Sequence, residues 1–143
     1  MLHEIMIFRN AVKKDIGFCL QISKQDNEQY WIESDFSSSI TNENSIFIVV
    51  EEKKEIIGYI LGFIVPTKED EAMIHESRIV KVQRGKKVGT KLVNEFCQEA
   101  FKRGVKIVYA MIESELEKFY INSCRFEKTG HWIEASKRLN GEK

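Results

Sequence analysis

The sequence of 143 residues is notable first for what it has little of. It contains a single proline, and its 22 basic and 22 acidic residues leave no formal net charge. Balanced charge argues against a surface devoted to nucleic acid or anionic membrane. The hydrophobic content of 43% argues against disorder and is enough for a real core. The length suits one domain, over residues 1–143.

Cysteines are also scarce. The chain has three cysteines, an odd number, and they are widely separated at Cys19, Cys97 and Cys124. There is no C-x-x-C pair that would suggest zinc or redox chemistry. The longest nearly uncharged run, Ile56–Val65, is too short to cross a bilayer as a helix. The first residues carry no secretory signal pattern. We therefore expect no metal site, no membrane partner and a cytoplasmic location.

Hydrophobic periodicity predicts an α+β (mixed α/β) domain with an antiparallel portion and one crossover helix. The expected strands are residues 4–9, 45–51, 56–65, 73–82 and 105–112, with a final hairpin of Phe126–Glu127 and His131–Ile133. The expected helices are residues 12–24, 28–40 and 88–103, and a fourth that begins at Ser114. For that fourth helix, Ser114 and Glu117 have the spacing of a capping box.

The most informative stretch is Arg78–Lys91, RIVKVQRGKKVGTK, which holds six cations and no acid. It lies where a strand ends and a helix begins, and helix N-termini accept phosphate groups readily. Gly85 and Gly89 would let the backbone approach a diphosphate closely. The other interpretation is a basic turn that faces solvent. The spacing excludes both the Walker pattern and the Gly-x-Gly-x-x-Gly fingerprint.

This segment resembles the pyrophosphate loop of the GNAT superfamily of acyl-CoA-dependent N-acetyltransferases, Arg/Gln-x-x-Gly-x-Gly/Ala. The matching residues are Arg84 to Gly89, with Lys87 in place of the first motif glycine. The resemblance implies a GNAT-like, mostly antiparallel sheet of six to seven strands flanked by about four helices, and acetyl-CoA as co-substrate. It also implies that strand residues before the loop act through their main chains. The implied cofactor-binding residues are Ser77, Arg78, Ile79, Arg84, Gly85, Lys86, Lys87, Val88, Gly89 and Thr90.

The downstream half agrees with this family in part. Phe119-Tyr120 matches the family's helix motif, whereas its Asn and small-residue positions are Glu113 and Leu116 here. Four residues, not the usual three, separate Tyr120 from Arg125-Phe126. Two explanations stay open: the helix end carries one extra residue, or Tyr120 is rotated by about 100° of helical turn.

Acyl transfer to an amine requires a base for the amine, donors for the oxyanion and a proton for the thiolate. Tyr120 is the candidate acid, because a phenol with a reference pKa of about 10 can protonate a thiolate. The other interpretation of Tyr120 is a core residue. Glu76 is the first candidate base and Glu113 the second, although both suit solvent-facing or helix-start positions. His75 is expected on the opposite sheet face from Glu76, and Cys124 is expected to be a buried thiol, not a nucleophile.

The predicted function is transfer of an acetyl group from acetyl-CoA to a primary amine of a small molecule, peptide or protein, in a ternary complex. The first two helices would recruit the acceptor, and their acidic residues would attract a cationic amine. Those acidic residues are Asp26, Glu28, Glu33, Asp35 and Glu43, with Tyr30, Trp31 and Phe36 as pocket or core aromatics. A non-catalytic acyl-CoA-binding module is the alternative, and nucleic-acid binding by the basic segment is less favoured. A homodimer is one possible assembly.

Overall fold

One sheet of five strands, in the order β1-β2-β3-β4-β5, organises the molecule. The computed structural model describes residues 5–25 and 31–140. All neighbouring strands are antiparallel except β4 and β5, which are parallel. The strands are β1 Met6–Asn10, β2 Ser45–Glu52, β3 Glu55–Ile64, β4 Glu71–Ile79 and β5 Ile107–Ala110. The α-helices are α1 Ile16–Lys24, α2 Glu33–Thr41 and α3 Val88–Lys102.

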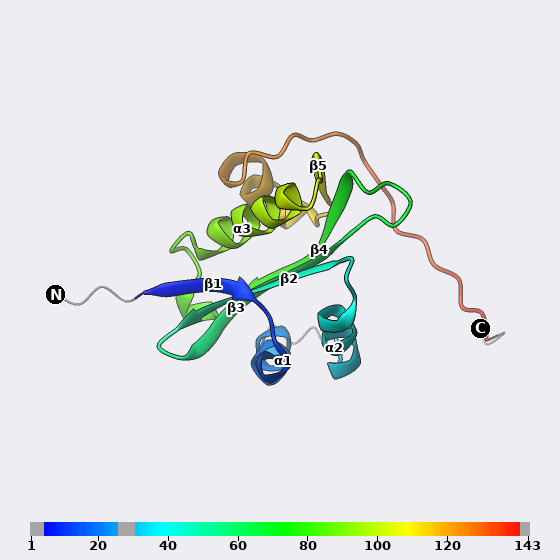
Figure 1. Ribbon diagram of the computed structural model, residues 1–143. Coiled ribbons are helices and arrows are strands. Elements are labelled where there is room, and N and C mark those ends of the chain that lie inside the picture. Colours follow the sequence, from blue (N-terminus) through cyan, green and yellow to red (C-terminus); the bar gives the residue numbers. More distant parts are fainter. Residues whose placement is uncertain (1–4, 26–30, 141–143) are drawn as a thin grey trace.

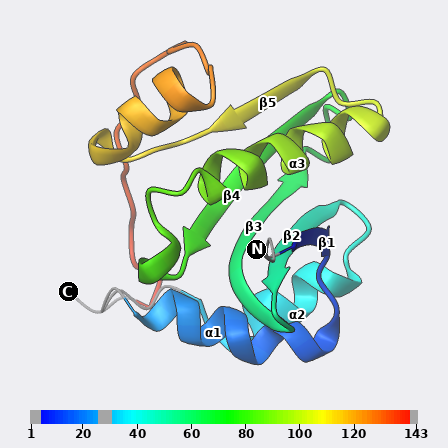
Figure 2. The ribbon, with the colours of Figure 1, turned by 90° about the vertical axis from the view of Figure 1, so that its left-hand side faces the viewer.

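Helices cover both faces of this sheet, with α1 and α2 on one side and α3 on the other (Figure 1). The α3 stripe predicted from the sequence is buried, and it packs on alternate residues of β2 and β3. The intervening residues of the same strands pack under α1 and α2. Because neighbouring strand residues face opposite ways, each strand serves both layers, which explains the nearly continuous apolar runs in β2 and β3. Figure 2 shows α3 as the crossover between β4 and β5.

The fold class, the antiparallel portion and the crossover helix are confirmed, but the strand count is lower than expected. The hairpin predicted at Phe126–Glu127 and His131–Ile133 is absent, since residues 125–138 form neither helix nor strand. Figure 1 shows this segment extending away from the sheet. Trp132 is 77% exposed and Ile133 is 93% exposed, so they bury too little surface to offset the cost of ordering a hairpin.

Several element ends also differ from expectation, and two of them lie beside the cleft described below. β4 stops at Ile79, and the chain continues into a 3-10 turn at Lys81–Gln83. The predicted capping box at Ser114 does not form, because Glu113 occupies the N-cap position of a 3-10 turn over Ser114–Leu116. The amide of Leu116 donates to the carbonyl of Glu113 at 2.9 Å, which places Ser114 inside the turn.

Candidate active site

A cleft opens where the two parallel strands part. β4 and β5 are paired from Glu71 opposite Ile107 to Ile74 opposite Ala110, and the pairing ends there. Beyond this point β4 continues for five residues beside β3 alone. The cleft between the separated ends has a volume of about 1030 Å³. Its lining combines the end of β4, the loop before α3, the segment after β5 and a helical turn that contains Tyr120.

The main chain at the end of β4 presents polar groups to this cleft. The amide of Val80 donates to the carbonyl of Ile57 in β3 at 2.9 Å. Backbone groups alternate in direction along a strand, so those of Arg78 also face β3, and those of Ser77 and Ile79 face the cleft edge. The Ile79 carbonyl already accepts hydrogen bonds from Gln25 Nε2 and Arg84 Nε. The cleft edge therefore offers the Ser77 main chain and the Ile79 amide.

The loop after β4 folds as the start of a helix with its N-terminus toward the cleft. Gly85 has a φ of +84° and Lys87, the N-cap of α3, has a φ of +65°. The left-handed conformation of Lys87 explains why glycine suits this position. The first helical bond is donated by Lys91 to the Lys87 carbonyl. The amides of Val88, Gly89 and Thr90 are thus not used by the helix and form a positive end without an acidic residue in the first turn.

The predicted loop residues divide by position. Arg84, Gly85, Lys87, Gly89 and Thr90 line the cleft, together with Ser77, Arg78 and Ile79 of β4. Val88 is 2% exposed and belongs to the core, so it can act only through its amide. Lys86 is exposed and lies outside the cleft lining.

Another wall of the cleft is a π-helix over Phe119–Ser123, which packs beside the first turn of α3. The amide of Cys124 donates to the carbonyl of Phe119 at 3.0 Å, five residues back. A π-helix holds one more residue per turn than an α-helix, so the extra residue noted in the sequence is taken up here. This geometry agrees with the explanation that the helix end carries one extra residue. Tyr120 lies on the cleft lining. A Cβ atom at Gly89 would lie 3.2 Å from the Phe119 ring, so Gly89 allows α3 and this turn to pack closely.

Tyr120 is both a core residue and a cleft residue. Its side chain is 5% exposed and its ring meets Phe119 and Phe126 at centroid distances of 5.0 and 5.4 Å. Burial raises the pKa of Tyr120 well above its ordinary value, and the nearby thiols of Cys124 and Cys97 add to this. The hydroxyl therefore keeps its proton at neutral pH.

Glu76 also lines the cleft, within a fixed network. Its Oε1 accepts a 2.7 Å hydrogen bond from Arg78 Nε, and its Oε2 accepts one of 2.8 Å from the hydroxyl of Tyr59. Burial raises the pKa of Tyr59, as does the adjacent carboxylate, so this hydroxyl remains a donor. Both oxygens of Glu76 therefore have donors in this structure.

The expectation for His75 was wrong. The register of β3 and β4 shifts so that Leu61 is opposite Glu76 and Gly62 is opposite Ile74, which leaves His75 as the extra residue of a bulge. His75 and Glu76 consequently share the α1–α2 face. The sequence signal was Gly62, because a Cβ there would overlap the Met73 carbonyl and the Phe96 ring. A glycine inside a strand pattern is typical of a bulge or a close backbone approach.

The acceptor region predicted from the sequence is partly described. Trp31 lines the cleft and its ring meets that of His75 at 4.9 Å, whereas Phe36 is fully buried and anchors α2. Glu113 lines the cleft as well. Glu33, Asp35 and Glu43 do not line it, and the predictions for Asp26, Glu28 and Tyr30 lie outside the described residues.

Within residues 5–25 and 31–140, no three His, Cys, Asp or Glu side chains are grouped so that they could hold a metal ion. No helix in that part of the chain has the length and apolarity to cross a bilayer.

Comparisons with known proteins agree with this architecture. A model described as the acetyltransferase (GNAT) family matches residues 12–126. Over 51 residues, 36% of this chain, the sequence is 39% identical to L-2,4-diaminobutyric acid acetyltransferase of Oceanobacillus iheyensis. Over 46 residues, 32% of the chain, it is 44% identical to the protein of that name from Virgibacillus pantothenticus. These matches span only 28% and 29% of the relatives' own lengths.

Solved structures are similar over nearly the whole chain. An aminoglycoside N-acetyltransferase in complex with CoA has a TM-score of 0.80 at 14% identity, covering 96% of this chain and 98% of that one. Glucosamine-6-phosphate N-acetyltransferase from Arabidopsis thaliana has a TM-score of 0.75 at 17% identity, covering 96% and 100%. At these identities the likeness concerns the fold, and it confirms the GNAT-like architecture expected from the sequence.

Proposed function

Because this chain belongs to the acetyltransferase (GNAT) family, we propose that it transfers an acetyl group from acetyl-CoA to a primary amine. The observation that carries the proposal is the cleft between the parted strands β4 and β5, closed at one end by the N-terminus of α3. That arrangement places main-chain donors and cations along one continuous wall. A linear substrate with a diphosphate in its middle fits such a wall.

The described residues fit the diphosphate of CoA. The amides of Val88, Gly89 and Thr90 point out of the helix end, and a Cβ at Gly85 would meet nothing within 4 Å, so the loop has room for a ligand. Arg84 and Lys87 supply positive charge on the cleft lining, with Lys86 beside them on the exposed side of the loop. The main chains of Ser77 and Ile79 would hold the pantetheine arm, whereas the main chain of Arg78 faces β3 and only its side chain can take part. Bound acetyl-CoA would supply the acetyl group as a thioester.

The protein contributes proton transfer to this reaction. The buried hydroxyl of Tyr120 keeps its proton, lines the cleft and can donate to the departing thiolate. Main-chain amides at the cleft edge can donate to the oxyanion. Glu76, the predicted base, would accept the amine proton while it also holds Arg78 and the Tyr59 hydroxyl.

We propose a cationic amine as the acceptor. Three carboxylates, those of Glu76, Glu113 and Glu115, line the cleft together with the Trp31 ring. Carboxylates and an aromatic face both favour a positively charged ligand. The proteins named for diaminobutyric acid and for aminoglycosides act, by name, on amine-bearing compounds of this kind. Both compounds are therefore the first to test.

Calorimetric titration with acetyl-CoA tests the cofactor wall. Gly89→Glu should weaken acetyl-CoA binding by about 100-fold or more, roughly 2.8 kcal/mol, because it brings a carboxylate and added bulk to the anion-binding helix end. Gly17→Glu is the control for a carboxylate added to a helix, and the melting temperature reports any strain of Gly89→Glu against Phe119. Gly17 also lies in a helix, has nothing within 4 Å of its Cβ position and lies outside the cleft lining. It should bind acetyl-CoA like the parent protein. Unchanged affinity in Gly89→Glu, with an unchanged melting temperature, would contradict the loop assignment.

Thiol release with L-2,4-diaminobutyrate and with aminoglycosides then tests turnover. Tight acetyl-CoA binding without turnover of any amine would instead favour the non-catalytic binding module.

A further inference from the structure

The bulge in β4 brings a second proton acceptor to the cleft. In a regular strand His75 would face away from Glu76, but the register shift opposite Leu61 and Gly62 inserts His75 as an extra residue. Its ring meets Trp31 at 4.9 Å and Phe63 at 6.4 Å, both on the α1–α2 side. His75 is exposed and lines the cleft.

The position of His75 along the strand is also specific. Ile74, the preceding residue, forms the last pair with Ala110 before β4 and β5 separate. His75 is therefore the first β4 residue beyond the point where the cleft opens. A side chain at this point borders the end of the cleft next to the paired strands, and its exposure lets an accepted proton pass to water.

Glu76 is less suited to accept a proton than its neighbour. Both of its oxygens already accept hydrogen bonds, from Arg78 at 2.7 Å and from Tyr59 at 2.8 Å. Its side chain is only 12% exposed. An approaching amine would have to share this carboxylate with Arg78 and the Tyr59 hydroxyl. The His75 side chain, in contrast, is flanked by aromatic rings and open to the cleft.

We infer that His75, rather than Glu76, is the general base of the proposed acetyl transfer; this rests on the proposed function. The acceptor ammonium first gives one proton to water; its neutral nitrogen then forms a bond to the thioester carbonyl carbon and passes a second proton to the imidazole of His75. The carbon–sulfur bond then breaks, and the thiolate takes the proton of Tyr120. Water returns the proton of His75 to solvent and restores that of Tyr120, so the sum is amide and free thiol. An imidazole suits this step because its neutral form has one unprotonated ring nitrogen that can accept a proton.

Charges of both signs surround this imidazole. On β4 itself the nearest are Glu76 and Arg78, and the hydroxyl of Tyr59 reaches Glu76 from β3. Packed beside His75 are the uncharged rings of Trp31 and Phe63. The remaining titratable groups on the cleft lining are Arg84, Lys87, Glu113, Glu115 and Tyr120.

The test is the pH profile of kcat/KM for thiol release, with L-2,4-diaminobutyrate and an aminoglycoside as amines, in the parent, His75→Gln and Glu76→Gln. His75→Gln should lower kcat/KM above pH 7 by about 100-fold, within the usual range for general-base catalysis. The fall of kcat/KM toward low pH, here called the acidic limb, should also lose the part that protonation of His75 causes, because glutamine does not titrate. Glu76→Gln should keep that limb. The amine titrates equally in all variants, so it cannot explain a difference between them.

His131→Gln is the matched control, since His131 is exposed in the segment outside the sheet and does not line the cleft. It should leave the profile unchanged. Calorimetric affinity for acetyl-CoA should stay at the parent value in His75→Gln, so a loss of turnover reports on the base and not on the cofactor wall. A limb that persists in His75→Gln and vanishes in Glu76→Gln would overturn the inference. Absence of turnover by the parent would overturn it together with the proposed enzyme activity, while acetyl-CoA binding would still report on the loop.

Discussion

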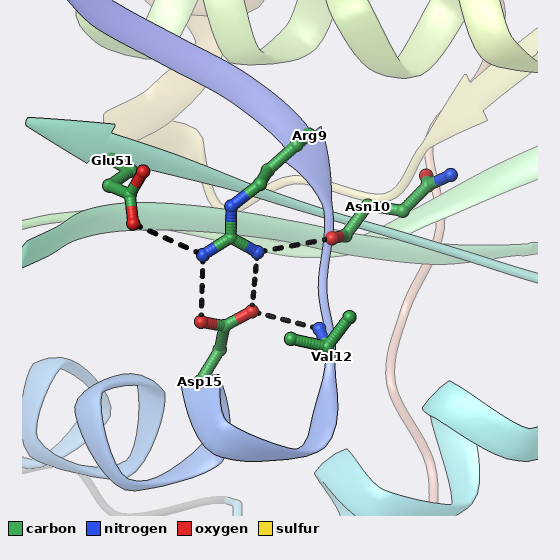
Figure 3. Close-up of polar contacts among 5 residues, drawn as sticks. All are labelled: Arg9, Asn10, Val12, Asp15 and Glu51. Atoms are coloured by element: carbon green, nitrogen blue, oxygen red, sulfur yellow. Dashed lines mark hydrogen bonds and ion pairs between the residues drawn. The ribbon is translucent and has the colours of Figure 1, made fainter. Parts of the chain in front are cut away.

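Two arginine–carboxylate pairs in this protein have the same chemistry and opposite surroundings. Arg9 holds Asp15 through both guanidinium ends, at 2.8 and 3.0 Å, and the amide of Val12 adds a third bond at 2.8 Å (Figure 3). Asp15 is 2% exposed, at the junction between β1 and α1. Arg78 holds Glu76 through Nε alone, and that pair forms part of the cleft lining.

The difference indicates what each pair is for. The Asp15 carboxylate is surrounded by donors and fixes the start of α1 to the sheet, with Glu51 as a weaker partner of Arg9 at 3.4 Å (Figure 3). Glu76 has two donors and one side toward the cleft, so it can still meet a ligand. A closed network therefore stabilises the fold, whereas an open one also shapes a site. Substitutions that remove one partner at a time separate these two roles.

The largest effect is expected from Asp15→Asn. An amide keeps the shape of the side chain but leaves Arg9 partly buried without its main counter-charge, which should lower the free energy of unfolding by about 3 kcal/mol. Urea denaturation at pH 7 measures this. Glu117→Gln is the control, because the ion pair of Glu117 and Lys128 is about half exposed on both sides and should contribute at most about 0.5 kcal/mol. A loss below 1 kcal/mol in Asp15→Asn would show that the closed network is not structural.

Lowering the pH should weaken the same Arg9–Asp15 pair, with a smaller effect on the free energy of unfolding. Burial by itself would raise the pKa of Asp15, but the hydrogen bonds from Arg9 and Val12 outweigh it, so its pKa lies below the ordinary 3.8. A group whose pKa is lower in the folded state stabilises the fold above its unfolded pKa. That stabilisation is lost as pH falls through the folded pKa. The stability difference between parent and Asp15→Asn should therefore shrink below about pH 4. A constant difference from pH 7 to pH 3 would contradict this assignment.

The sequence predicted those parts of the molecule that depend on local pattern. The apolar runs of β2 and β3 and the stripe of α3 each correspond to buried faces, because the periods of strand and helix are visible in any single segment. The basic segment Arg78–Lys91 was likewise found from charge and glycine spacing alone. Family membership confirmed the resemblance that this segment suggested.

Features that depend on two segments were missed. The bulge at His75 exists because β3 and β4 pair with a one-residue offset beside Gly62, where Phe96 of α3 packs against the strand. A one-residue offset reverses the face of a side chain, so counting along β4 alone placed His75 wrongly. The prediction of the final hairpin was wrong because pairing with another segment is missing, not because it is shifted. Its local pattern favours strands, but the described structure gives those residues no partner strand.

The smallest effect is expected from Tyr59→Phe, which opens the cleft network further without removing a charge. The ring stays packed on Phe36, at a centroid distance of 5.3 Å, and only the hydroxyl bond to Glu76 is lost. The free energy of unfolding should fall by about 1 kcal/mol, a third of the effect of Asp15→Asn, because Glu76 keeps Arg78 and borders the cleft, where water can replace the hydroxyl. The same variant frees one oxygen of Glu76. If His75 is the base, the acidic limb of kcat/KM stays in place; a limb that moves in Tyr59→Phe would show that the proton is accepted at Glu76.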